Sequence, residues 1–213
     1  MNKTLIIMSG FSGAGKGSIL NSLKQNCAIE IVKSVTTRKQ RSADDYYEFV
    51  SVEEFERRWT AGDLLEANKY VSGHYGTPLA AIQRILRNGN VALLEIDQNG
   101  YRQVVDGGIY SKDEICSIFI AAEAEDLLSR LTKRGTENSL QIIKRLETAV
   151  VEADGIPMYD HLIVNKDLTE AWKKLGRVLS GEIVRDEFNV YTFQRKVSEI
   201  ITKLKAGRKE KAQ

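Results

Sequence analysis

The stretch GFSGAGKGS occupies residues 10–18, between a short apolar run and a helix-like segment. Its glycines Gly10, Gly13 and Gly15 permit backbone conformations that a Cβ atom would block, so successive N–H groups can point towards phosphate oxygens. The N-terminus of the following helix favours the same negative charge, and Lys16 adds a cation that can reach terminal phosphates. The order strand, glycine-rich turn and helix therefore predicts a phosphate-binding loop.

One position departs from the pattern GxxxxGK[ST] that is usual for such loops. Gly17 stands where serine or threonine is expected, and the hydroxyl group comes one position later, at Ser18. Because the glycines and the lysine are intact, phosphate binding is still expected. Direct metal binding by a hydroxyl group of residue 17 is excluded.

Length and composition limit the possible functions. The 213 residues suffice for one α/β core with a small insertion. Lys and Arg total 31 against 29 acids, a net charge of +2, so general binding to nucleic acid or to a membrane surface is not expected. No apolar run approaches the ~20 residues of a membrane span, and a soluble, cytoplasmic protein is expected. Cys27 and Cys116 have no metal-ligand spacing, and packing as thiols in a reducing compartment is expected.

Apolar runs bounded by turn signals alternate with helical patterns along most of the chain. Such alternation predicts an α/β fold with a doubly wound parallel sheet, covered by helices on both faces. The expected strands lie at residues 4–8, 29–32, 91–96, 115–120 and 161–164. The expected helices lie at residues 79–87, 125–133 and 140–151.

Two regions fall outside this alternation. Residues 34–75 contain short β-like pieces at 46–50 and 65–71 around a helix that starts near Val52, which indicates a small inserted subdomain. Near the end of the chain, apolar residues at helical spacing predict an amphipathic last helix that packs on the body, and the basic segment 205–213 is expected to fray. The apolar positions of that helix are Phe193, Val197, Ile200, Ile201 and Leu204.

A second candidate phosphate site follows the loop. The segment SVTTR at residues 34–38, together with Arg41, places two guanidinium groups three residues apart on a hydroxyl-rich segment. Such groups can form bidentate contacts with a phosphate. Two phosphate sites imply a donor and an acceptor, although this segment taken alone fits a solvated loop equally well.

Four further segments follow in order along the chain. They are YEFVS at 47–51, LLEANKYVSGHYGTP at 64–78, LLEIDQNG at 93–100 and KRGTENSLQIIKRL at 133–146. Over about residues 4–180 this ordered series resembles the guanylate kinase family. The resemblance implies transfer of the γ-phosphoryl group of ATP to GMP, giving ADP and GDP.

The resemblance also implies a division of the chain. A P-loop NTPase core would comprise residues 1–33 and 79–182, with a helical lid near 130–146. A GMP-binding subdomain would comprise residues 34–78, and residues 183–213 would form a C-terminal helix and a basic tail.

On the GMP side, the resemblance implies that Glu66 and Thr77 read the guanine edge. Guanine presents an N1–H and a 2-amino donor side by side, and a carboxylate offers two acceptor oxygens. Adenine lacks that donor pair, so a buried, unpaired Glu66 would reject it. The expected GMP-binding residues are Ser34, Arg38, Arg41, Tyr47, Glu66, Tyr75, Thr77 and Asp97.

On the ATP side, the glycine-rich loop and Asn165, near the adenine, are implied. The expected ATP-binding residues are Gly10, Phe11, Ser12, Gly13, Ala14, Gly15, Lys16, Gly17, Ser18 and Asn165. The expected catalytic residues are Lys16, Asp97 and the lid arginines Arg134 and Arg145, with added charge from Arg130 and Lys144. The lid cations could instead be ordinary helix residues that pair with Glu137 and Glu147.

Magnesium is expected as the cofactor of ATP. No direct metal ligand from the protein is expected, because Mg²⁺ prefers a partly hydrated octahedral site and residue 17 has no hydroxyl. Ser18 and Asp97 are candidates for contact through water. Glu95 and Asp97 also fit the simpler reading of solubilising acids at a strand end.

The chain departs from the family pattern at several positions. The segment between Arg41 and Tyr47 is shorter than usual, Gln40 replaces a proline, Lys166 replaces an acid, and Ala67 and Asn68 replace a Trp-Ala pair. These departures keep open a kinase with another phosphate acceptor. A non-catalytic module that binds protein partners is a further alternative, which the intact loop disfavours. The oligomeric state is left open.

Overall fold

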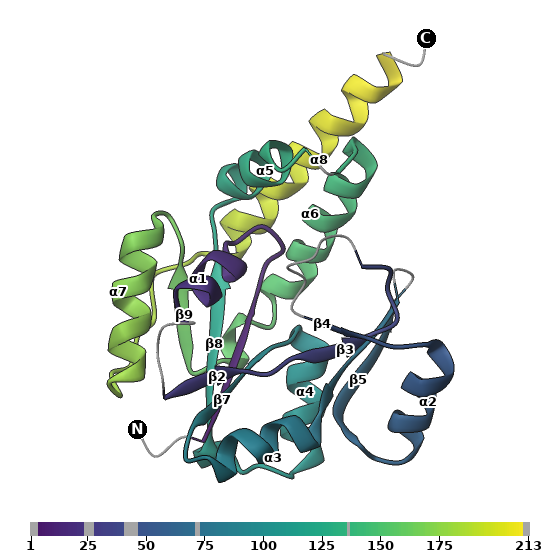
Figure 1. Cartoon of the computed structure of the whole chain (residues 1–213). Coiled ribbons are helices and arrows are strands. Elements are labelled where there is room, and N and C mark those ends of the chain that lie inside the picture. Colours follow the sequence, from purple (N-terminus) through teal and green to yellow (C-terminus); the bar gives the residue numbers. More distant parts are fainter. Residues whose placement is uncertain (1–3, 24–27, 41–46, 71–72, 136, 211–213) are drawn as a thin grey trace. The chain divides into compact units, whose positions relative to one another are not determined.

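Figure 1 shows the computed structural model, which describes residues 4–23, 28–40, 47–70, 73–135 and 137–210. The chain divides into two compact units. Unit 1 contains residues 9–21 and 117–213, and unit 2 contains residues 2–8 and 22–116.

The main sheet has five strands in the order β2-β7-β1-β8-β9. Its strands are β1 (Leu5–Gly10), β2 (Ile29–Ile31), β7 (Val91–Glu95), β8 (Ile115–Ala121) and β9 (His161–Val164). The pairs β1 with β7, β2 with β7 and β8 with β9 are parallel. All residues of β8 and β9 are buried, as expected for parallel strands covered on both faces. The predicted α/β fold with a parallel sheet is confirmed.

Unit 2 contains a second sheet of four strands in the order β4-β3-β6-β5. Its strands are β3 (Ser34–Thr36), β4 (Tyr47–Phe49), β5 (Leu64–Tyr70) and β6 (Gly73–Pro78). Val35, Phe55, Leu64 and Ala67 form its buried core. The helices of unit 2 are α2 (Val52–Thr60), α3 (Leu79–Arg87), α4 (Gln98–Gly107) and the 3₁₀ turn η1 (Lys112–Glu114).

Unit 1 contains the glycine-rich loop and most of the helices. These are α1 (Lys16–Leu23, which runs just beyond the unit), α5 (Ala124–Lys133), α6 (Ser139–Ala153), the 3₁₀ turn η2 (Ile156–Met158), α7 (Leu168–Leu179) and α8 (Val190–Glu210). Phe193 of α8 stacks on Phe11 at 4.7 Å between ring centroids, so the last helix packs on the body as predicted. The expected fraying does not begin at residue 205, because α8 continues to Glu210.

The predicted elements match the structure best where periodicity is strong. The helix expected at 79–87 is α3, and those expected at 125–133 and 140–151 are α5 and α6, each slightly longer. Strands β3 and β6 and helices α4 and α7 were not predicted. Cys116 is buried as a free thiol, as expected, whereas Cys27 lies outside the described residues. Within the described part of the chain, no helix has the length and apolar character needed to cross a bilayer.

Candidate functional site

The glycine-rich loop depends on glycine at two close contacts. Gly10 has φ +149°, and a Cβ there would lie 2.1 Å from the carbonyl oxygen of Ile120. Gly15 has φ +96°, and a Cβ there would lie 2.4 Å from Nδ2 of Asn165. Side chains at either position would therefore clash with fixed atoms, and the loop conformation requires both glycines.

Gly17 differs from these two glycines. A Cβ at this position would have no heavy atom within 4 Å, and Gly17 lies in the first turn of α1. The departure from the usual pattern is therefore not imposed by steric crowding. The hydroxyl group of Ser18 follows in the same turn.

Lys16 lies at the first residue of α1, and its side chain folds back onto the loop. Its Nζ donates to the carbonyl oxygen of Gly10 at 2.8 Å and to that of Phe11 at 3.3 Å. This geometry keeps the ammonium group beside the loop, where a phosphate oxygen could replace a carbonyl as its acceptor.

Phe11 and Ala14 are fully buried and support the loop from inside the protein. The Phe11 ring packs against Phe119 and Phe193, and its N–H donates to the carbonyl oxygen of Ile120 at 3.2 Å. The N–H of Ala14 donates to the carbonyl oxygen of Phe11 at 3.0 Å. These contacts give both residues a role in the conformation of the loop.

Two polar side chains bind the carbonyl oxygen of Ala14. Asn165 donates from Nδ2 at 2.7 Å, and Arg130 donates from Nη1 at 3.1 Å. Arg130 also donates from Nη2 to the carbonyl oxygen of Asn165 at 2.7 Å. Oδ1 of Asn165 is buried and has no partner among the described residues, so one acceptor stays available beside the loop. Sequence reasoning treated Arg130 only as nearby charge, because its contacts join segments far apart in sequence.

The two expected lid arginines differ in their surroundings. Arg145 of α6 pairs with Glu137 at 2.6 Å, and its Nη1 donates to the hydroxyl oxygen of Ser12 in the loop. The Glu137 side chain is only 7% exposed. Arg134, the C-cap residue of α5, is exposed. Arg145 therefore pairs with Glu137, as an ordinary helix residue would, and also contacts the glycine-rich loop.

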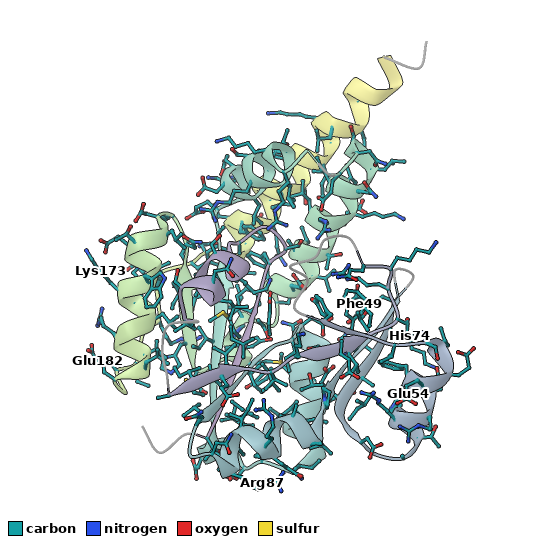
Figure 2. The ribbon with its side chains drawn as sticks, viewed as in Figure 1. Phe49, Glu54, His74, Arg87, Lys173 and Glu182 are labelled. Atoms are coloured by element: carbon teal, nitrogen blue, oxygen red, sulfur yellow. The ribbon has the colours of Figure 1, made fainter. Side chains whose placement is uncertain are left out.

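In unit 2, strand pairing gathers several expected GMP-binding residues. Ser34 of β3 lies opposite Tyr47 of β4, and the rings of Tyr47 and Tyr75 lie 5.8 Å apart. The guanidinium carbon of Arg38 lies 4.9 Å from the Tyr47 ring centroid and 5.4 Å from that of Phe49, labelled in Figure 2. Two tyrosine side chains from this small sheet thus lie near a cation from the segment that follows β3. Arg41 and the rest of the shortened segment, residues 41–46, lie outside the described residues.

Glu66 of β5 is 5% exposed, and both of its carboxylate oxygens accept hydrogen bonds. Thr77 donates to Oε1 at 2.7 Å, and Asn68 donates to Oε2 at 2.9 Å. A Cβ on Gly100 would lie 2.8 Å from Oε2, so glycine at this position allows α4 to approach the carboxylate. Glu66 and Thr77 come together as expected.

Burial raises the pKa of Glu66 from its ordinary value of 4.5 to about 7. The hydrogen bonds from Thr77 and Asn68 oppose this shift, and the nearby charge of Asp97 adds to it. Hydrogen-bond donors of a bound ligand would favour the ionised form of the carboxylate. The site is therefore prepared for a ligand that donates hydrogen bonds.

Asp97 is the N-cap residue of α4, a role that sequence reasoning did not assign. Its Oδ1 accepts from the N–H of Gly100 at 2.9 Å, and its Oδ2 accepts from the hydroxyl group of Tyr70. Burial, and then the bond to Asp97, raises the pKa of Tyr70. Glu95, by contrast, is exposed at the end of β7. Among the described residues, no group of three or more His, Cys, Asp or Glu could hold a metal ion.

Comparisons with a family model, with curated proteins and with solved structures all point to the same family. A family model described as Guanylate kinase matches residues 2–182. The chain is 39% identical over 181 residues to the Guanylate kinase of Mycoplasmoides gallisepticum, covering 82% of this chain and 91% of that protein. It is 37% identical over 188 residues to the Guanylate kinase of Clostridioides difficile, covering 84% of this chain and 87% of that protein. The crystal structure of guanylate kinase from Anaplasma phagocytophilum matches with a TM-score of 0.64 and 25% identity, covering 86% of this chain and 87% of that one.

Proposed function

The chain belongs to the guanylate kinase family, and from this premise we propose how its residues carry out the transfer of the γ-phosphoryl group from ATP to GMP. The enzyme is an ATP:GMP phosphotransferase that forms ADP and GDP. The observation that carries the assignment of residues is the buried carboxylate of Glu66, held by Thr77 and Asn68.

ATP binds to unit 1. Backbone N–H groups of the loop at residues 10–18 and the N-terminus of α1 receive the phosphates, and Lys16 exchanges its carbonyl acceptors for β- and γ-phosphate oxygens. The buried Oδ1 of Asn165 accepts a hydrogen bond from the adenine amino group. Arg130 holds the loop and Asn165 together and so fixes the distance between these two contacts.

GMP binds to unit 2. The phosphate is held by Arg38, Ser34, Tyr47 and Tyr75, and by Arg41, which lies outside the described residues. In the complex, Glu66 accepts the N1–H and 2-amino hydrogens of guanine. Adenine cannot supply this donor pair, so the remaining lone pairs of the buried carboxylate would stay unsatisfied and adenine would be rejected.

Phosphoryl transfer leaves little covalent work for the protein. The phosphate oxygen of GMP attacks the γ-phosphorus of ATP, the bond to the β–γ bridging oxygen breaks, and ADP leaves with that oxygen. Lys16, Arg134 and Arg145 offset the charge that spreads over the transferred group, and Asp97 helps to position the acceptor. Arg145 has five N–H donors, so it can contact a phosphate oxygen while it remains paired with Glu137.

Mg²⁺ bound to ATP would neutralise part of the charge on its phosphates. Ser18 and Asp97 offer hard oxygen atoms, which suit water-mediated contact with Mg²⁺, and the described residues contain no cluster suited to direct protein ligation. A cytoplasmic location stays a prediction from the sequence, as does the absence of nucleic acid and membrane partners. No observation on the described residues favours another phosphate acceptor or a non-catalytic binding module.

A coupled assay of ADP release tests the assignment of the acceptor. With Mg²⁺ and ATP, we expect turnover with GMP and dGMP, and little with AMP or a phosphorylated sugar. Glu66→Gln is expected to reduce the use of GMP far more than the binding of ATP. Folded wild-type protein that shows no turnover with GMP would refute the function. If Glu66→Gln lost the use of GMP and the binding of ATP equally, Glu66 would have only a structural role.

A further inference from the structure

One face of β5 carries three polar side chains that contact groups of the acceptor site. Alternate residues of a strand share a face, so Glu66, Asn68 and Tyr70 lie on the same side of the sheet. Tyr70 binds Asp97, and Asn68 binds Glu66.

The orientation of the Asn68 amide follows from a chain of hydrogen bonds that begins at the backbone. The N–H of Ala67 donates to Oε1 of Gln103 in α4 at 3.0 Å. Because Oε1 is fixed in this way, Nε2 of Gln103 faces the carbonyl oxygen of Ala67 at 3.1 Å and Oδ1 of Asn68 at 3.1 Å. With Oδ1 of Asn68 turned towards Gln103, its Nδ2 must face Glu66, at 2.9 Å from Oε2.

These contacts leave the Glu66 carboxylate with a defined capacity for a ligand. A carboxylate offers about four lone-pair sites, two on each oxygen. Thr77 uses one site on Oε1, and Asn68 uses one on Oε2. One further site on each oxygen matches the side-by-side N1–H and 2-amino donors of guanine.

We propose that Asn68, oriented by Gln103, positions the Glu66 carboxylate for guanine and is a specificity-determining residue of the acceptor site. The proposal rests on the proposed reading of guanine by Glu66. Asn68 acts through Glu66 and is a positioning residue. Gln103 acts one step further away, by fixing which end of the Asn68 amide points to the carboxylate.

The proposal has an electrostatic consequence. The hydrogen bond from Asn68 lowers the pKa of Glu66 against the larger effect of burial, and Thr77 acts in the same direction. Within the described part of the chain, the titratable groups that interact with Glu66 are Asp97 at the start of α4 and Tyr70 on its own strand. Loss of the Asn68 amide therefore favours the protonated carboxyl, which cannot accept both guanine donors.

The test uses full-length protein and measures dissociation constants of GMP and ATP by calorimetry between pH 6 and pH 8. The variants are Asn68→Ala, Asn68→Asp and Glu66→Gln. The control is Lys69→Ala, because Lys69 is exposed, lies on the opposite face of β5 and pairs with Glu56. Thermal unfolding checks that each variant is folded.

We expect Asn68→Ala to weaken GMP binding about tenfold at pH 7, the loss typical of a hydrogen bond to a charged group. The pH dependence of GMP binding is expected to shift to higher pH in the same variant. Asn68→Asp is expected to weaken GMP binding more, because a second carboxylate faces Glu66. ATP binding is unchanged in both, and Lys69→Ala binds GMP normally.

A packing role would give the opposite order, because Asp has the shape of Asn and Ala does not. That order, or normal GMP binding by both Asn68 variants while Glu66→Gln loses it, overturns the inference and leaves the role of Glu66 intact. Normal GMP binding by Glu66→Gln itself overturns the proposed reading of guanine, and the inference with it.

Discussion

The two proposed nucleotide sites are built in different ways. In unit 1 the phosphate loop is shaped by backbone geometry: Gly10 and Gly15 have positive φ, and a side chain on either would collide with neighbouring atoms. In unit 2 recognition depends on side chains, with Glu66 buried between two donors. A backbone site suits phosphate, which every nucleoside triphosphate carries, whereas a side-chain site can distinguish one base from another. Specificity for the base is therefore expected to come from the side chains of unit 2.

The largest effect is expected from a side chain at Gly10. In Gly10→Ala the new Cβ would lie 2.1 Å from a backbone oxygen, at a φ of +149°. We expect a loss of stability of about 3 kcal/mol or more and a fall in activity of at least about 100-fold. Unfolding midpoints and steady-state kinetics measure the two.

A matched control lies in the same unit. Gly176, in α7, would place a Cβ in open space, with no other heavy atom within 4 Å. Gly176→Ala is expected to stabilise the protein by about 0.5–1 kcal/mol, the helix preference of Ala over Gly. If the two variants behaved alike, the loop would not owe its shape to the missing Cβ of Gly10.

A smaller effect, confined to ATP, is expected from Arg130. Arg130→Met removes two hydrogen bonds from a cation to the carbonyl oxygens of Ala14 and Asn165. We expect the KM for ATP to rise about tenfold and the KM for GMP to stay unchanged. Lys133→Met, which changes an exposed residue of the same helix, serves as the control. Equal losses for both nucleotides would remove the distinction between the two sites.

The last effect concerns stability and pH, and not the affinity for a nucleotide. The pKa of Glu66 is about 7 in the folded protein and ordinarily 4.5, so between these values the folded state binds more protons than the unfolded state. Its contribution to stability is complete below pH 4.5 and is lost as pH rises through 7. Relative to Glu66→Gln, the wild type should lose about 2 kcal/mol between pH 5 and pH 8. Urea unfolding at several pH values measures the free energy of unfolding of both proteins. The stability of the wild type minus that of Glu66→Gln should fall as pH rises, and a constant or rising difference would contradict the prediction.

The sequence was most informative where a local pattern decides the structure. The apolar runs predicted the five strands of the main sheet, and the periodicity of residues 79–87 predicted α3 to the residue. Strand β6, in contrast, reads GHYGTP, and its glycines and proline are typical of a turn. It is a strand because it pairs with both β5 and β3, a tertiary effect that local preference cannot predict.

The candidate site divides in the same manner. The positions of Lys16, Glu66 and Thr77 followed from motifs, because the motifs themselves carry the chemistry. The contacts of Asn68 with Gln103, 35 residues apart, required the fold, and so did those of Arg130 with Ala14. The sequence identified Asn68 as a departure from the family pattern, but it did not indicate that Gln103 would be its partner.

We propose that a buried carboxylate in unit 2 reads guanine, separately from the loop that binds ATP. The most direct measurement is the dissociation constant of GMP between pH 5.5 and pH 8 for the wild type and Glu66→Gln, with ATP measured alongside. We expect the affinity of the wild type for GMP, corrected for the phosphate titration seen in the variant, to fall about tenfold per pH unit below about pH 7. ATP affinity should be the same in both proteins. Parallel pH profiles for GMP in the two proteins, or an equal loss of ATP affinity in the variant, would contradict the claim.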